Sequence, residues 1–158
     1  RPDEQAQPVV AFEPDRDGSM VIFGTGGSGK STALRSLAIA AGFSQARGGP
    51  CHVYGIDFGA RGLSMIEQLP HVGAVVNSDD NERVVRLMRQ LRATIDERAE
   101  RYARLNVATI TEYRQRSGDT LEPRRWIAST RDERTHDSQR SRVRATESMW
   151  CVANLVET

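Results

Sequence analysis

The chain contains a single lysine, Lys30, although lysine and arginine together account for 22 of its 158 residues. Arginine supplies every other basic side chain, and 21 acidic residues reduce the formal net charge to +1. Nucleic-acid-binding domains often carry a clear basic excess, which this chain lacks. The composition therefore excludes a general attraction to polyanions, and any contact with DNA would require a local basic patch.

Long apolar runs are also absent. No stretch approaches the roughly 20 apolar residues that a membrane helix requires, and the first residues do not form a secretory signal. We therefore expect a cytoplasmic domain, whose only link to a membrane would be through other parts of a parent protein. The start at Arg1 instead of methionine leads us to expect such a longer parent.

Cysteine is scarce as well. Cys51 and Cys151 lie far apart and lack the spacing of a zinc or redox site. Cys51 opens an apolar segment, where a small thiol packs well. We therefore expect an unpaired cysteine that is buried at position 51.

Apolar segments alternate with helical patterns through most of the chain. We expect buried strands at 20–23, 51–56 and 73–76, and helices at 31–41, 63–69, 79–106 and 109–116. Residues 20–23 are typical of a fully buried parallel strand, and Val9 to Phe12 is a candidate edge strand. Gly42 is expected to end the first helix as a C-cap, and Asp79 with Glu82 to begin the long one. The alternation predicts an α/β fold with a parallel sheet flanked by helices.

The lone lysine follows the first expected strand, in a loop that fits the phosphate-binding pattern G-x-x-x-x-G-K-S/T at every defined position. Backbone N–H groups of such a loop form a nest for phosphate oxygens, and the helix that follows adds a partial positive charge. Lys30 would bridge the β- and γ-phosphates of ATP, Ser31 would bind Mg²⁺, and Thr32 would donate to the α-phosphate. The predicted nucleotide site comprises Gly24, Thr25, Gly26, Gly27, Ser28, Gly29, Lys30, Ser31 and Thr32. The alternative is a glycine-rich turn that only caps a helix.

Hydrolysis needs more than this loop, because a carboxylate at the end of another strand must hold the water shell of the metal ion. Asp57 is the only acid in residues 1–122 that ends an apolar strand. Two interpretations remain open at this point. Asp57 is a magnesium ligand, or it caps the following loop or pairs with an arginine.

Several short motifs, in their order and spacing, resemble a family of motor ATPases. They are Gly24 to Thr32, Gly55 to Gly59, Leu69 to Gly73, Asp80 through Arg86, Arg98 to Tyr102, and Ile110 with Tyr113 and Arg114. Together they resemble an FtsK/SpoIIIE-type ATPase domain. Asp-Phe-Gly combined with Leu-Pro-His-Val-Gly is most similar to the EccC ATPase domains of type VII secretion. The resemblance covers residues 18–123.

The resemblance implies a RecA-like P-loop NTPase that binds ATP and Mg²⁺. It also implies a ring or tandem array with other ATPase domains or subunits, which moves a secreted polypeptide or double-stranded DNA. In this family the magnesium-binding Walker B aspartate ends an apolar strand that would follow Pro123. Residues 123–129 lack both the apolar run and the acid, so we expect the fold to stop before the Walker B strand, and hydrolysis of ATP stays open.

The chain is therefore divided into an N-terminal linker or edge strand (1–17), a partial ATPase domain (18–123) and an atypical polar tail (124–158). The tail is a candidate for disorder. Either it has diverged, as in a regulatory module that binds nucleotide without hydrolysis, or the reading frame is broken near codon 124. A broken frame would account for the tryptophans, the loss of periodicity and the unrelated composition of the tail. We favour the broken frame, and a gene without an apolar run ending in aspartate in another frame would exclude it. A small P-loop kinase is a further alternative, but the helix at 79–106 does not resemble the lid of such an enzyme.

Overall fold

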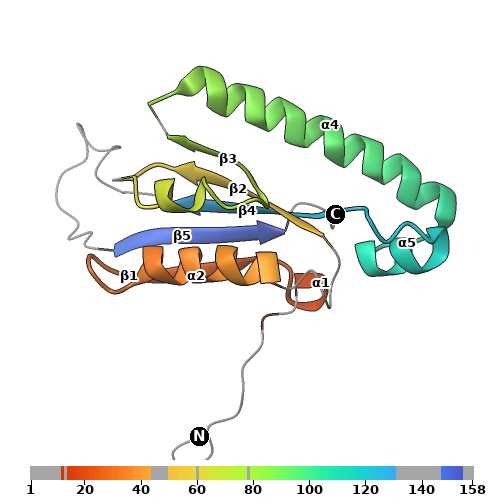
Figure 1. Ribbon diagram of the computed structural model, residues 1–158, viewed down its shortest axis with the longest axis horizontal. Helices are drawn as coiled ribbons and strands as arrows, with labels where there is room; N and C mark the ends of the chain where they lie inside the picture. Colours follow the sequence, from red (N-terminus) through yellow and green to blue (C-terminus); the bar gives the residue numbers. More distant parts are fainter. Residues whose placement is uncertain are drawn as a thin grey trace, which may run out of the picture.

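The structure is a computed structural model that describes residues 12, 14–43, 50–59, 61–77, 79–130 and 147–154, with only the backbone at 14–15 and 147–154. One five-stranded sheet carries helices on both faces (Figure 1), which confirms the predicted α/β fold. Its elements are α1 (Pro14–Asp17), β1 (Met20–Thr25), α2 (Lys30–Phe43), β2 (Cys51–Asp57), η2 (Ser64–Ile66), β3 (Val72–Asn77), α4 (Asn81–Leu105), α5 (Ile110–Ser117), β4 (Arg124–Thr130) and β5 (Glu147–Asn154).

The strands lie in the order β1-β5-β4-β2-β3. β3, β2 and β4 are parallel to one another, whereas β5 runs antiparallel to both β4 and β1. Two antiparallel steps leave β1 pointing the same way as β4. The carboxyl ends of β1, β2, β3 and β4 therefore meet at one edge of the sheet, which is where α/β proteins bind their ligands.

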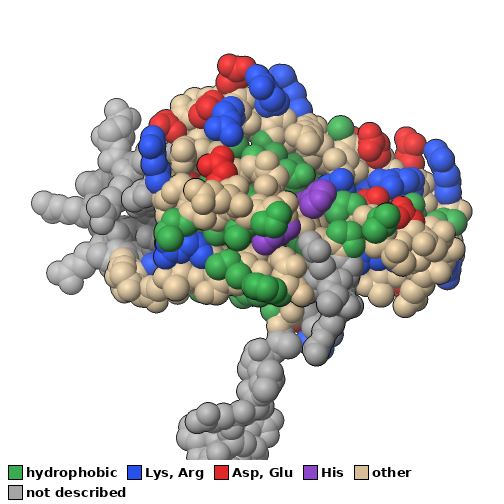
Figure 2. Space-filling view, viewed as in Figure 1, with side chains coloured by type: hydrophobic (Ala, Val, Ile, Leu, Met, Phe, Trp, Pro, Cys, Tyr) green, Lys and Arg blue, Asp and Glu red, His purple; other side chains and the backbone are tan. Residues whose placement is uncertain are grey.

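Each face of the sheet has its own apolar core. α2 covers one face, where Leu34 packs with Val53. α4 covers the other, where Leu91 packs with Ile56, and α5 packs against the carboxyl-terminal end of α4 (Figure 1). The outer side of α4 carries acidic and basic side chains in alternation (Figure 2), and none of the described helices is long and apolar enough to cross a membrane.

The prediction of a fully buried strand at 20–23 is wrong. β1 is the last strand at one edge of the described sheet, and its side chains alternate between the core and the surface. Met20 and Ile22 pack toward the core beneath α2, whereas Val21 and Phe23 are 44% and 64% exposed. An apolar tetrapeptide has the same sequence whether one face or both are covered, so the pattern alone does not distinguish the two cases.

The sheet continues beyond the point where the sequence analysis expected it to stop. Arg124–Thr130 forms β4, parallel to β2 from the pair Cys51 and Arg124 to the pair Asp57 and Thr130. β4 has a strand on each side, so its backbone groups are paired at both edges although its side chains form no apolar run. β4 contains no acidic side chain and ends in Thr130. Residues 131–146 and 155–158 lie outside the described chain, and the broken reading frame stays a prediction.

Three helix boundaries also differ from expectation. Asp80, and not Asp79, is the N-cap of α4, since its carboxylate accepts a hydrogen bond of 3.0 Å from the backbone N–H of Arg83. Residues 63–69 form only the short 3₁₀ turn η2. Gly42 lies inside α2 and does not cap it. The candidate edge strand at Val9 to Phe12 lies outside the described residues except for Phe12.

The glycine at position 42 is explained by packing. A Cβ atom there would lie 2.4 Å from Cε1 of His71. The His71 ring is buried, and its Nε2 lies 2.7 Å from the carbonyl oxygen of Ala38, which holds the ring against α2. Because Gly42 has no side chain, His71 can pack directly against α2. His71 immediately precedes β3, so this contact brings the start of β3 close to the helix.

We expect Gly42→Ala to destabilise the protein, although alanine is the better helix former by about 1 kcal/mol. Overpacking of a filled core costs about 1–3 kcal/mol, and this should outweigh the gain in propensity. Urea unfolding would measure the difference. In a His71→Ala background the obstacle is gone, so the same substitution should become stabilising. A stabilising effect in the presence of His71 would show that the ring moves away at little cost.

Candidate functional site: the glycine loop between β1 and α2

The predicted nucleotide site forms a continuous loop at the carboxyl edge of the sheet. Gly24 and Thr25 end β1, residues 26–29 make the turn, and Lys30 to Thr32 form the first turn of α2. Gly27 and Gly29 have positive φ angles of 77° and 89°, a region that disfavours side chains with a Cβ atom. The path of the backbone thus requires glycine at positions 27 and 29.

The lone lysine is buried within this loop. Lys30 is only 6% exposed, and its Nζ donates hydrogen bonds to the carbonyl oxygen of Thr25 and, over 3.2 Å, to Oγ of Ser28. A Cβ atom at Gly24 would lie 2.6 Å from that same Oγ. The ammonium group is therefore held by hydrogen bonds to groups of the loop itself.

The first turn of α2 carries the two predicted hydroxyl ligands. Oγ of Ser31 lies beside the loop after β2, because a Cβ atom at Gly62 would lie 3.4 Å from it. Oγ1 of Thr32 is on the exposed side and accepts a hydrogen bond of 3.2 Å from Arg35. The loop after β2 thus forms one wall of the site beside Ser31, while Thr32 faces solvent.

Asp57 shapes this wall. Its Oδ1 accepts hydrogen bonds from the backbone N–H of Gly59 (2.9 Å) and from the hydroxyl of Thr130 (2.8 Å), and its Oδ2 accepts one from the N–H of Leu63 (2.8 Å). The side chain is 1% exposed. Of the two interpretations, the structure supports the cap of the following loop, because both carboxylate oxygens already accept hydrogen bonds from the protein.

The residues present fit nucleotide phosphates better than they fit a metal ion. For phosphate they offer a loop with two positive-φ glycines, the start of a 14-residue helix and a buried ammonium group. For Mg²⁺ they offer the hydroxyl of Ser31, and the described residues contain no group of three or more histidine, cysteine or acidic side chains that could hold a metal. When bound, Mg²⁺ would neutralise phosphate charge, and Ser31 would be its ligand from this chain.

A second polar cluster, which the sequence analysis did not identify, lies where β4 begins, at the end of the strands opposite the glycine loop. Oε1 of Glu122 accepts from Nε of Arg98 (2.8 Å) and from Arg125 (3.4 Å), and its Oε2 accepts from Arg101 (2.9 Å). We call Arg98, Arg101, Arg125 and Glu122 the arginine cluster. Burial raises the pKa of Glu122, but the hydrogen bond from Arg101 and the charge of Arg98 outweigh it, so this pKa lies below its ordinary value.

The prediction for Cys51 is confirmed. Its thiol is free and buried. Burial raises the pKa of Cys51 to about 11, although the nearby charges of Arg124 and Arg114 act in the opposite direction. Such a thiol stays protonated at neutral pH and is a poor nucleophile. The side chain of Cys151 lies outside the described part of the chain.

Comparison with known proteins agrees with this geometry. The chain is 28% identical over 120 residues to the type VII secretion system protein EssC of Staphylococcus aureus, covering 76% of this chain and 8% of EssC. It is 34% identical over 108 residues to the ESX-1 secretion system protein EccCb1 of Mycobacterium tuberculosis, covering 67% of this chain and 18% of that protein. It therefore spans only a small part of these relatives.

The fold has a solved counterpart. The structure of EssC ATPases 2 and 3 from Geobacillus thermodenitrificans matches with a TM-score of 0.67 and 28% identity, over 79% of this chain and 24% of that one. The sequence also matches the FtsK/SpoIIIE family over residues 1–143. With the family pattern spread over most of its length and the glycine loop in place between β1 and α2, this chain belongs to the FtsK/SpoIIIE family and is related to the ATPases of type VII secretion.

Proposed function

We propose that this chain is the ATP-binding domain of a motor that moves a secreted polypeptide, with the nucleotide held by residues 24–32. The observation that carries the proposal is the conformation of the glycine loop. Two glycines with positive φ turn the loop into the start of α2, and the buried ammonium of Lys30 lies at its mouth. This arrangement offers positive charge and N–H donors to a polyphosphate from three sources at once.

The relatives and the net charge of the chain support a polypeptide as the proposed cargo. Two of the similar proteins are described as secretion system proteins, and the chain lacks the basic excess that favours DNA. Relatives with several ATPase units, such as EssC with its ATPases 2 and 3, support work in a tandem array or ring with other ATPase domains. If the cargo is double-stranded DNA, the protein should bind duplex DNA with an affinity that falls steeply as the salt concentration rises. If the cargo is a polypeptide, we expect no affinity for duplex DNA.

A second candidate function is a regulatory module that binds ATP without hydrolysing it. Two observations favour it. Both oxygens of Asp57 are engaged in hydrogen bonds, and β4 ends in Thr130 at the place where the family has its Walker B aspartate. Without a carboxylate there, nothing among the described residues holds the water shell of a metal ion beside Ser31. The two candidates share the binding site and differ only in turnover.

We expect Lys30→Ala to weaken ATP binding at least tenfold, equivalent to about 1.4 kcal/mol. The loss follows because the ammonium group makes charge-assisted hydrogen bonds to phosphate oxygens that no other side chain of the loop replaces. Isothermal titration with ATP would measure it. Arg104→Ala is the matched control, since it removes an exposed positive charge at the far end of α4. Equal affinity in Lys30→Ala and the unaltered chain would refute the site.

Turnover separates the two candidate functions. Phosphate release from ATP in the presence of Mg²⁺ would support the motor, provided that Lys30→Ala abolishes it. Saturable binding without release would support the regulatory module. The secretion motor also requires partner ATPase domains, so the assay should be repeated with this domain inside the full-length parent.

A further inference from the structure

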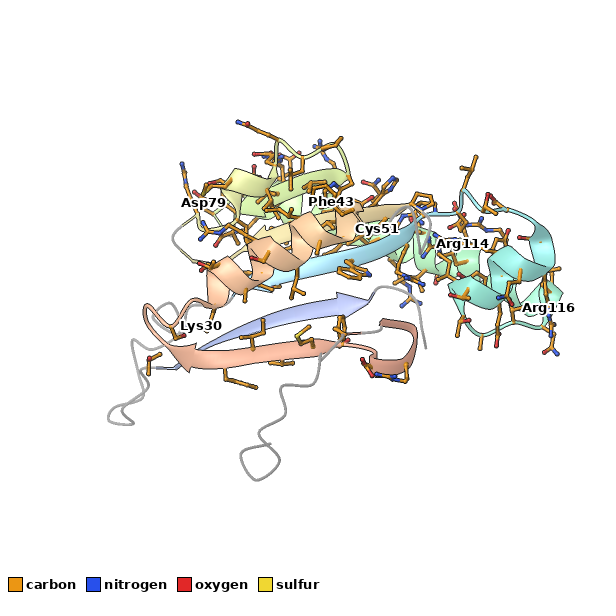
Figure 3. The ribbon with its side chains drawn as sticks, turned by 60° about the horizontal axis from the view of Figure 1, so that its bottom comes forward. Lys30, Phe43, Cys51, Asp79, Arg114 and Arg116 are labelled. Atoms are coloured by element: carbon orange, nitrogen blue, oxygen red, sulfur yellow. The ribbon has the colours of Figure 1, made fainter. Side chains whose placement is uncertain are left out.

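The arginine cluster lies far from the glycine loop. Lys30 is at one end of α2, whereas Arg114 and Cys51, which lie beside the cluster, are at the opposite end of the sheet (Figure 3). The cluster is assembled from α4, from the start of β4 and from the segment before it. His52 of β2 lies beside it, because His52 is the register partner of Arg125 in the neighbouring strand β4. The cluster thus has no part in the proposed nucleotide site.

Its charges are not balanced. Three guanidinium groups share the single carboxylate of Glu122, which leaves a net charge of +2. Burial, followed by the charge of Arg125, lowers the pKa of Arg98. Burial, Arg125 and Arg98 likewise lower the pKa of His52. For both groups the carboxylate of Glu122 acts in the other direction and raises the pKa.

One buried donor in the cluster also has no acceptor. Arg98 is 1% exposed. Its Nε and Nη2 form the edge that Glu122 occupies, and Nη2 also donates to the carbonyl oxygen of Pro123. Its Nη1, which points away from that edge, is buried and has no hydrogen-bond partner among the described residues. A buried N–H group without an acceptor is unfavourable, so Nη1 of Arg98 favours a further acceptor beyond the described residues.

We propose that the arginine cluster binds a phosphate group as a second ligand site of this chain. A phosphate group near neutral pH carries a charge close to −2, which matches the excess of the cluster, whereas a single carboxylate would leave it half compensated. Guanidinium groups present N–H donors in the planar geometry that phosphate oxygens accept. The side chains of Arg101 and Arg125 remain 35% and 19% exposed, which gives the ligand a route from solvent.

The test follows the imidazole of His52 by NMR during titration with inorganic phosphate, with ionic strength held constant by sodium chloride. The protein carries Lys30→Ala so that binding at the glycine loop does not contribute, and His52→Gln assigns the signal. We expect a saturable shift of the His52 resonances and a rise in the pKa of His52, because a bound anion stabilises the imidazolium. A shift that does not saturate would overturn the proposal.

Arginine variants locate the site. Arg125→Gln is expected to weaken phosphate binding at least tenfold, and Arg101→Gln, which lies nearer the surface, serves as the second variant if the first does not fold. Arg104→Gln is the control, since Arg104 is exposed and pairs with Glu100, and it should bind phosphate as before. Equal binding in Arg101→Gln, Arg125→Gln and Arg104→Gln would mean that phosphate does not bind in the cluster.

Two further titrations identify the source of the phosphate group. If glycerol phosphate binds more tightly than inorganic phosphate, the site is assigned to a phosphorylated ligand. If glycerol phosphate binds more weakly than inorganic phosphate, the site is assigned to free phosphate. Acetate tests the charge argument, because a monovalent carboxylate is expected to bind at least tenfold more weakly. Acetate binding of equal strength would refute the assignment to phosphate.

Discussion

Glu122→Ala is expected to lower the free energy of unfolding by about 3–5 kcal/mol, the usual cost of removing one partner from a buried ion pair. Glu122 is 8% exposed and is the shared carboxylate of Arg98, Arg101 and Arg125. Without it Arg98 would remain buried with no counter-charge. Denaturant unfolding monitored by circular dichroism would measure the loss.

The matched control for this substitution is Glu100→Ala. Glu100 also pairs with an arginine, Arg104, but both side chains are more than 70% exposed, and exposed pairs contribute roughly 0–1 kcal/mol. The expected effect of the control is therefore below 1 kcal/mol. Similar losses in the two variants would mean that the Glu122 carboxylate is effectively exposed to solvent.

The same carboxylate makes stability depend on pH. The pKa of Glu122 is lower in the folded chain than its ordinary value, because the hydrogen bond from Arg101 and the charge of Arg98 outweigh the effect of burial. Its contribution is complete above the ordinary pKa of about 4.5 and is lost as the pH falls through the lower folded value. Glu122→Gln should therefore reduce the loss of stability on acidification.

Asp57→Ala is expected to cost about 2–4 kcal/mol, since it leaves the N–H groups of Gly59 and Leu63 and the hydroxyl of Thr130 without their acceptor. It should also release the wall of the glycine loop beside Ser31, so ATP affinity is expected to fall. Urea unfolding and ATP titration of the same variant would measure both effects.

Two variants control this experiment. Asp79 is an acidic residue at the same edge of the sheet, and its side chain is 75% exposed. Asp79→Ala should change the free energy of unfolding by less than about 0.5 kcal/mol. Thr130→Val removes only the hydroxyl. In a double-mutant cycle the Asp57 and Thr130 substitutions should be non-additive, because the two groups form a direct hydrogen bond. Additive losses would show that Asp57 acts through the loop alone.

Local features of the fold could be predicted from the sequence. The glycine loop, the alternation of strands and helices, and the end of α5 at Gly118 each depend on a few neighbouring residues. Gly118 is a left-handed C-cap with φ of 73°, and Asn106 ends α4 in the same region. Nearby residues favour a helix end at both positions, and the predicted ends of α4 and α5 lie within one residue of the observed ones.

Features that depend on distant pairing could not be predicted in this way. β4 is stabilised by backbone bonds to strands on both sides, and the sequence Arg-Arg-Trp-Ile-Ala-Ser-Thr carries no sign of them. Glu122 precedes a proline in an otherwise polar segment, and its partner Arg98 is 24 residues earlier on α4. For Asp57 the residue type allowed both a metal ligand and a loop cap, and only the positions of Leu63 and Thr130 distinguish them.

The position of β5 has a consequence for the order of folding. Among the described strands β5 is the only neighbour of β1, and their first register pair joins Met20 to Val152. The strand that leads into the glycine loop therefore gains this neighbour only after the chain has been synthesised as far as residue 152. Contacts between such distant segments form late, because closing a long loop has a large entropic cost. The parallel strands β2, β3 and β4 can therefore assemble before β1 gains its neighbour in the sheet.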